Sequence, residues 1–160
     1  MKSFRDELEL IYDKFRQQMF ICALAITGCQ DVAEDAIHKA FCQLLQLKHS
    51  PQNLKAYIFK CVRNAAIDLI RQNARMHTFS DDYIFEPTDS PREVAEKKEF
   101  QQRVGKALLT LSEDERETIV QHLFTDLTFR EIAEMRNLPI GTVTSWYHRG
   151  LANLREKMEE

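Results

Sequence analysis

Apolar residues follow one another at spacings of three and four along the first part of the chain, as on one face of an α-helix. The first such stretch predicts a helix over residues 3–26, and Gly28 is suited to end it. Its apolar positions are Leu8, Ile11, Phe15, Met19 and Cys22.

A second helix is predicted over residues 31–47. Asp31 is a suitable N-cap and Glu34 stands three positions later, as in a capping box. The apolar positions repeat with the helical period and are Ala33, Ile37, Ala40, Phe41 and Leu44. The opposite face is polar and carries Glu34, Asp35, His38, Lys39, Gln43 and Gln46.

A third helix is predicted from Pro51, with Ser50 as its cap, to about Met76. Its apolar positions are Leu54, Ile58, Cys61, Val62, Ala65 and Leu69. A second stripe is polar and mostly basic, and consists of Lys60, Asn64, Ile67, Arg71 and Arg75. Three amphipathic helices of this kind can close one small bundle.

Residues 79–91 show no apolar periodicity, are acidic and contain two prolines. This composition is typical of a flexible linker. We therefore predict three parts: a helical domain over 1–78, an acidic linker over 79–91, and a second helical domain over 92–160. Only four Gly and four Pro occur in the chain, which is too few for many tight hairpins and favours an all-α fold.

The second domain begins with a predicted helix over 92–110. Ser112 and Glu115 form a capping-box pattern for the next helix, and Thr128 and Glu131 form another. Pro139 is expected to start the last helix, which runs to about Met158.

Residues 128–149 have the pattern of a helix-turn-helix, with a break at Asn137 between a short helix and a longer one. Inward-facing positions of the second helix are Val143, Tyr147, Leu151, Leu154 and Met158. The candidates to face DNA are Thr142, Thr144, Ser145, Trp146, His148 and Arg149. A plain helical hairpin in a bundle would show a similar pattern, so both readings remain open on these residues alone.

The formal net charge of −3 is unevenly distributed. Residues 1–75 carry 11 Lys and Arg against 8 Asp and Glu, whereas residues 76–100 carry 3 against 7. Contact with DNA must therefore come from local basic faces. No secretory signal or membrane-length apolar run is found, which predicts a cytoplasmic protein without membrane insertion.

The residues that carry catalysis in enzymes do not form a recognisable set. The five histidines are scattered, and no phosphate-binding loop occurs. The four cysteines lie in helix-like stretches without C-x-x-C spacing, so we expect reduced thiols. We predict no metal, no cofactor and no active site.

The order of these motifs resembles that of bacterial sigma factors of the extracytoplasmic-function (ECF) type. Residues 31–41 (DVAEDAIHKAF) are similar to region two, and residues 54–71 (LKAYIFKCVRNAAIDLIR) to the stretch that follows it. Residues 128–149 are similar to the helix-turn-helix of region four. The resemblance implies a promoter-recognition subunit that binds core RNA polymerase and promoter DNA. It also allows for an anti-sigma partner that clamps the two domains.

The resemblance assigns roles to the first domain. In the family the helix at 31–47 grips a coiled coil of the largest polymerase subunit, which implies polymerase binding by Glu34, Asp35, His38, Lys39 and Gln43. His38 and Lys39 depart from the usual Gln and acidic residue, which changes the charge of this grip. The loop at 48–53 and the next helix imply capture of the melted minus-ten element by Asn53, Lys60, Arg63, Asn64, Arg71 and Arg75. Tyr57 or Phe59 either stacks on a base or belongs to the core, and Asp68 is expected to orient Arg71 or Arg63.

Region four departs further from the family, since Thr144 and Trp146 stand where Lys or Arg is usual. Each lost phosphate contact lowers the slope of the salt dependence of DNA binding by about one. We therefore expect an upstream element read with weak electrostatics; a steep salt dependence for the isolated 101–160 fragment would contradict this. Two alternatives to a sigma factor are a helix-turn-helix regulator that acts without core polymerase and a sigma-like interaction protein. Run-off transcription with core polymerase separates the three.

Overall fold

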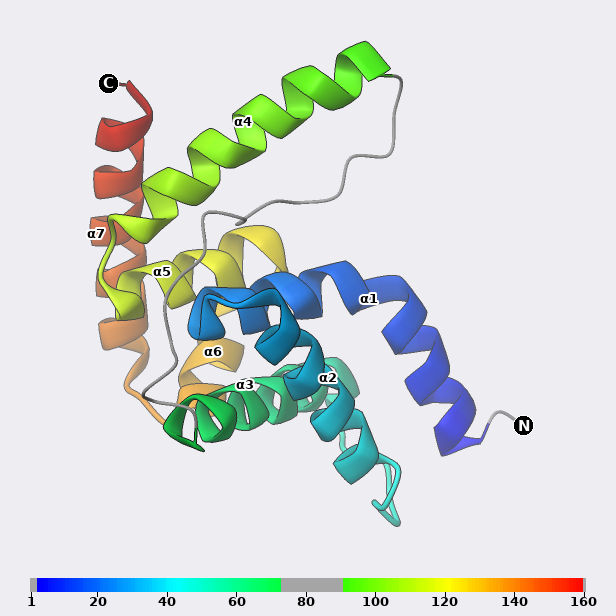
Figure 1. Ribbon diagram of the computed structural model, residues 1–160. Coiled ribbons are helices and arrows are strands. Elements are labelled where there is room, and N and C mark those ends of the chain that lie inside the picture. Colours follow the sequence, from blue (N-terminus) through cyan, green and yellow to red (C-terminus); the bar gives the residue numbers. More distant parts are fainter. Residues whose placement is uncertain (1–2, 73–90, 160) are drawn as a thin grey trace.

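The computed structural model describes residues 3–72 and 91–159, with only the backbone described at 91–95 and 97. Helices make up most of these residues, and no strand occurs among them, which confirms the all-α prediction (Figure 1). The first three are α1 (Phe4–Thr27), α2 (Gln30–Leu44) and α3 (Leu54–Gln72). They are followed by α4 (Pro91–Leu109), α5 (Glu113–Ile119), the π-helix η1 (Val120–Phe124), α6 (Phe129–Arg136) and α7 (Ile140–Glu159).

Helices α1, α2 and α3 pack against one another in the first half of the chain. Their contacts are lined by fully buried small residues, which allow close approach of the helix backbones: Ala33, Ala36, Ala40, Ala65 and Ala66. Larger side chains fill the remaining space, and the Phe15 and Phe59 rings meet edge to face at 6.5 Å. The predicted three-helix arrangement is therefore present.

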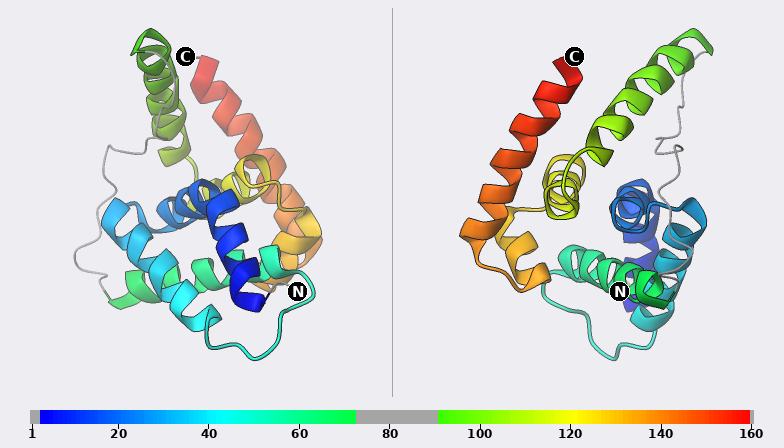
Figure 2. Two further views of the ribbon diagram at one scale, coloured as in Figure 1. Left: turned by 90° about the vertical axis from the view of Figure 1, so that its right-hand side faces the viewer. Right: turned by 60° about the vertical axis from the view of Figure 1, so that its left-hand side comes forward.

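In the second half, α7 crosses α5 at Gly150, which is buried. A Cβ atom at this position would lie 3.1 Å from Glu115 Cβ and 3.2 Å from Ile119 Cγ1, so glycine permits this close crossing. Helix α4 contacts α7 near α5 and diverges from it toward the N-terminal end of α4, so that the two helices form a V in Figure 1. Both views of Figure 2 show α4 and α7 projecting from the same side of the molecule. The Arg103 guanidinium donates a hydrogen bond to the Met158 carbonyl oxygen, 3.1 Å away.

The two halves pack directly on each other. Helix α1 contacts α5 and η1, and α3 contacts α6. Figure 1 shows α5 lying beside the C-terminal part of α1 while α6 lies beside α3. The buried apolar side chains of both halves belong to one continuous core cluster.

Capping boxes begin three of the described helices, and left-handed residues end two of them. Ser112 and Thr128 each accept a hydrogen bond from the backbone N–H three residues later, and the reciprocal carboxylate bonds of both predicted capping boxes are present. Ser3 forms a third capping box with Asp6, which was not predicted. Gly28 and Asn137 end α1 and α6 in the left-handed conformation.

Two predicted helix starts were wrong. Helix α2 begins at Gln30, with Cys29 at the N-cap and no side-chain cap, so Asp31 and Glu34 do not form a capping box. The Thr27 hydroxyl instead donates to the Cys29 carbonyl oxygen, and the chain turns into α2 before it reaches Asp31. Helix α3 begins after Asn53, whose Oδ1 atom accepts from the Ala56 N–H at 3.2 Å, and not after Ser50.

The helix that begins after Ser112 changes character at Val120, where its hydrogen bonds widen to the π pattern over Val120–Phe124, a change that was not predicted from the sequence. The Thr125 hydroxyl donates to the Gln121 carbonyl oxygen at the end of this stretch. Asp126 then has φ 60°, which turns the chain into α6.

The predicted linker lies outside the described residues except for Pro91, which begins α4. Arg75, one of the residues predicted to bind DNA, also lies outside the described residues. Among the helices that the structure describes, none has the length and apolar character of a membrane span.

Candidate nucleic-acid and polymerase interfaces

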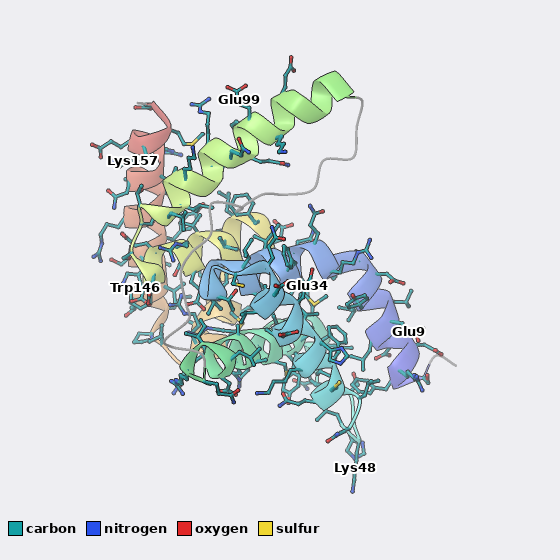
Figure 3. The ribbon with its side chains drawn as sticks, in the orientation of Figure 1. Glu9, Glu34, Lys48, Glu99, Trp146 and Lys157 are labelled. Carbon is teal, nitrogen blue, oxygen red and sulfur yellow. The ribbon has the colours of Figure 1, made fainter. Side chains whose placement is uncertain are left out.

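A groove of about 1070 Å³ runs between α1 and α2. Three residues predicted to bind polymerase line it, namely Glu34, Asp35 and His38, and all three are exposed. Glu34 and Glu9 are labelled on its two sides in Figure 3. The apolar floor includes Leu8, Phe20, Ile37 and Phe41, while Tyr12 and Leu45 are 39% and 53% exposed at its edges. A groove with an apolar floor and charged walls is suited to a protein helix.

The other two predicted polymerase-binding residues lie off this groove. Gln43 is exposed on α2. Lys39 is half-buried, and its Nζ atom lies 3.9 Å from the carboxylate of Asp68 on α3. Asp68 therefore pairs with Lys39, and the prediction that it orients Arg71 or Arg63 was wrong.

The predicted minus-ten residues fall into two groups. Lys60, Asn64 and Arg71 are exposed along α3. Phe59 is 2% exposed and belongs to the core, so it cannot stack on a base, whereas Tyr57 is half-buried. Contact with the Cys61 thiol, together with some burial, raises the pKa of Tyr57.

The second group, Asn53 and Arg63, is bonded to the other half of the molecule. The Asn53 amide donates to Glu131 Oε2 on α6 at 2.6 Å. The Arg63 guanidinium donates to Glu117 Oε1 on α5 and forms an ion pair with it. Between them, Lys55 Nζ donates to the Thr125 carbonyl oxygen at 3.1 Å. The sequence contains no local signal for these contacts, since their partners lie more than fifty positions apart.

Glu117 is the centre of a buried polar cluster. Its carboxylate also accepts from Gln121 Nε2 at 2.8 Å and pairs with Arg136 Nη2 at 3.2 Å. The Arg136 side chain is 2% exposed, and it further donates to the Thr118 hydroxyl at 2.7 Å and to Asp114 at 3.1 Å. Burial lowers the pKa of Arg136, although Glu117 opposes this shift.

Helices α6 and α7 form the predicted helix-turn-helix. Asn137 adopts φ 55° and ψ 51°, and the Leu138 N–H donates to the Ala133 carbonyl oxygen at 2.9 Å, which closes the turn. Behind the turn, the His122 ring stacks on Phe129 at 4.0 Å, and Tyr147 meets both edge to face. The inward positions Val143 and Leu154 are buried, as predicted.

The predicted reading face of α7 is accessible. Ser145, His148 and Arg149 are exposed, and Arg149 donates to the Ser145 hydroxyl at 3.1 Å. Thr142 and Thr144 are half-exposed, and the Thr144 hydroxyl donates to the Gly141 carbonyl oxygen at 3.1 Å. Trp146 is half-buried because its ring lies over the Arg136 guanidinium, 5.0 Å from the centroid. Figure 3 places Trp146 well away from Glu34 and Lys48, so this face is distinct from the α1–α2 groove.

In the part of the chain that the structure describes, no three His, Cys, Asp or Glu residues are grouped so that they could hold a metal ion.

Comparison with known proteins gives two family matches. Residues 11–76 match the family described as Sigma-70 region 2, and residues 101–154 match Sigma-70, region 4. The first range contains α2 and α3 and the second contains the helix-turn-helix.

Similar proteins have one common description. The chain is 29% identical to the ECF RNA polymerase sigma factor RpoE of Cereibacter sphaeroides over 131 residues, which cover 81% of this chain and 71% of the relative. It is 25% identical to the ECF RNA polymerase sigma factor SigM of Bacillus subtilis, with 92% and 93% of the two chains covered.

Among solved structures, the sigma factor RpoE in complex with the anti-sigma factor NepR from Bartonella quintana has the same fold. The TM-score is 0.72 at 22% identity, and 99% of this chain and 98% of that chain are covered. The two matched regions, the relatives and the shared fold all point to one family. The chain therefore belongs to the sigma-70 family and is a sigma factor of the ECF group.

Proposed function

We propose that this sigma factor binds core RNA polymerase through the α1–α2 groove and the exposed face of α2. Glu34, Asp35 and His38 supply the groove side of this contact and Gln43 extends it along α2. Lys39 contributes at the edge, where its pair with Asp68 limits its reach. The acidic groove wall favours a basic helix of the polymerase.

Melted minus-ten DNA is held by α3 and the residues just before it. Lys60, Asn64 and Arg71 offer exposed donors to the phosphates. Arg75, which lies outside the described residues, is proposed for the same role from the sequence alone. Asn53 reads an unpaired base edge, and Arg63 holds the backbone beside it. An exposed strand needs both kinds of contact, since phosphate contacts position it and base contacts select it.

The upstream element is read by α7, and the observation that carries this proposal is the exposed face behind the Asn137 turn. Ser145, His148 and Arg149 are its outermost polar side chains. Thr142 and Thr144 lie at the N-terminal end of the helix, where backbone N–H groups and hydroxyls suit a phosphate. Trp146 offers the ring edge left uncovered by Arg136 to a thymine methyl group.

These assignments make the protein a specificity subunit that works in the cytoplasm and has no active site of its own. Residues 1–78 carry the polymerase and minus-ten functions, residues 92–160 carry the upstream reader, and residues 79–91 link them. A possible anti-sigma factor is a further partner, and no cofactor is required.

The test is transcription of fragmented host genomic DNA by core polymerase, with the products identified by sequencing. We expect the protein to produce transcripts that start at a defined set of sites. Charge reversal in E34K/D35K is expected to remove core binding in a pull-down and transcription with it, whereas E99K/E156K, changed at exposed positions on α4 and α7, retains both. Duplex binding without core-dependent transcripts would instead indicate a regulator, and core binding without transcripts would indicate an interaction protein.

A further inference from the structure

Trp146 is the one large apolar side chain among the residues proposed to read the upstream element. It is half-buried, and the centroid of its ring lies 5.0 Å from the central carbon of the Arg136 guanidinium. The two residues belong to different helices of the helix-turn-helix, Trp146 to α7 and Arg136 to α6. The stack therefore ties the proposed reading face to the helix that precedes it.

The Arg136 guanidinium is itself held firmly in place. Its Nη1 atom donates a hydrogen bond to the Thr118 hydroxyl, 2.7 Å away. Its Nη2 atom lies 3.1 Å from a carboxylate oxygen of Asp114 and 3.2 Å from one of Glu117. All three acceptors belong to α5, and the Arg136 side chain is 2% exposed. The position and the plane of the guanidinium are thus set by α5.

The third nitrogen of this guanidinium gives the stack its importance. Arg136 Nε is buried and has no hydrogen-bond partner among the described residues. The π face of the Trp146 ring lies over the same guanidinium and supplies the electron-rich surface that a buried cation needs. The orientation of the indole ring is therefore fixed by a residue that is itself buried and cannot contact DNA directly.

The chemistry of duplex DNA limits what a fixed indole ring can recognise. Base pairs present their edges in the major groove and keep their faces stacked, so the ring cannot stack on a base there. The apolar group among these edges is the 5-methyl group of thymine. The charge beneath the ring does not serve the phosphates, because it is buried and paired with Asp114 and Glu117. An indole in this setting is suited to a thymine methyl group.

We infer that Arg136 is a positioning residue that sets the Trp146 ring against one base pair of the upstream element, where thymine is selected by its methyl group. This inference rests on the proposed role of α7 as the reader of that element. It names the residue that makes the choice, the chemical group that is chosen and the buried side chain that holds the reader in place. Thr142 and Arg149 lie one helical turn to either side of Trp146 and supply the polar contacts around it.

Removal of single methyl groups from the DNA tests this inference. The full chain is combined with core polymerase and with a promoter identified by the transcription experiment above, in which each thymine of the upstream element is replaced in turn by uracil. Uracil differs from thymine only by the absence of the 5-methyl group. We expect the replacement at one position to weaken promoter binding about fourfold, which is the effect of one buried methyl group. W146A is expected to bind the thymine and uracil promoters equally, and W146F to keep part of the preference.

R149A is the matched control on the same helix. Loss of this exposed charge is expected to weaken binding to thymine and uracil promoters alike and to lower the slope of the salt dependence by about one. W146A should leave that slope unchanged, because it removes no phosphate contact. R136K keeps a positive charge but loses the planar group held by α5, and it is expected to reduce the thymine preference while promoter-dependent transcription continues. Circular dichroism verifies the fold of each variant.

Several results would overturn the inference. Equal binding of wild-type protein to all thymine and uracil promoters would show that no methyl group is read, although transcripts from defined sites would leave the proposed function intact. The same thymine preference in W146A and wild type would assign the contact to another residue. A preference unchanged in R136K would show that Arg136 does not position the ring. Absence of transcripts with wild-type protein would instead refute the proposed function, and the inference would fall with it.

Discussion

The two halves of this sigma factor are held together by different means. The core of α1, α2 and α3 is apolar, and among its described residues only Thr27 is a buried polar side chain. The second half buries a set of polar and charged side chains: Glu115, Arg116, Glu117, Thr118, Gln121, Thr125 and Arg136. The half proposed to bind polymerase and melted DNA thus rests on packed volume, whereas the half proposed to read duplex DNA rests on hydrogen bonds and ion pairs.

The difference matters because the two kinds of core fail differently. An apolar core loses stability in proportion to the volume removed. A buried ionic cluster loses most when one partner is removed, because the remaining charge stays buried without compensation. Glu117 adds a further property, since the same carboxylate serves the second-half core and the boundary with Arg63.

The largest expected effect is in the apolar core. The variant F59A removes a ring that is 2% exposed and packs edge to face on Phe15, and should lower the free energy of unfolding by about 4 kcal/mol. F59L keeps most of the volume and is the control. Denaturant unfolding followed by circular dichroism measures both. Similar stability of the two variants would show that volume does not govern this half.

A somewhat smaller loss is expected from the ionic cluster. R136M replaces the buried guanidinium with a shorter, uncharged side chain and leaves Glu117 paired with Arg63 alone, which should cost about 3 kcal/mol. R136K retains a positive charge and should cost less. The same unfolding experiment compares them. If methionine is tolerated as well as lysine, the cluster does not depend on charge and the contrast between the halves disappears.

The loss of a helix cap should lower the free energy of unfolding by the same amount in the two halves. S112A removes a cap from α5 and S3A removes one from α1, and each should cost about 1 kcal/mol. S112T, which retains a hydroxyl, should be close to wild type. Unfolding measurements on all three variants check this. A loss confined to S112A would extend the contrast from the cores to the helix ends.

The smallest effect concerns pH. Partial burial raises the pKa of Glu131, but hydrogen bonds from the Thr128 amide and hydroxyl and from Asn53 outweigh it, so the pKa lies below its ordinary value of 4.5. A lowered pKa contributes stability above the unfolded value, and this contribution is lost as the pH falls through the folded value. The stability difference between wild type and E131Q should therefore be constant near neutrality and shrink below the ordinary value. An unchanging difference throughout that acid range would contradict the assignment.

What could be predicted from sequence was local. The capping boxes at Ser112 and Thr128 and the left-handed turn at Asn137 depend on neighbouring residues, and all three are present. The failed cap at Asp31 shows the limit of this approach, because the Thr27 hydroxyl and Gly28 together start α2 earlier than Asp31 would. A capping motif predicts a helix start only where the preceding turn does not start the helix earlier.

Contacts between distant segments could not be predicted. The sequence singled out Asn53 and Arg63 by type and position but carried no information on Glu131 and Glu117 as their partners. The π-helical turn at Val120–Phe124 could not be predicted from the spacing of apolar residues either. It is accompanied by the packing of η1 on α1 and by the hydrogen bond of the Thr125 hydroxyl. The roles of the polymerase-facing and DNA-facing residues remain predictions that the experiments above address.

The stacking of Trp146 on Arg136 has an optical consequence. Trp146 is the chain's single tryptophan, so the indole emission of the protein comes from one known position on the recognition helix. Its ring is in contact with the guanidinium that shares Glu117 with Arg63. A fluorescence spectrum therefore samples the proposed duplex-reading face and the boundary between the halves at once, without any label attached.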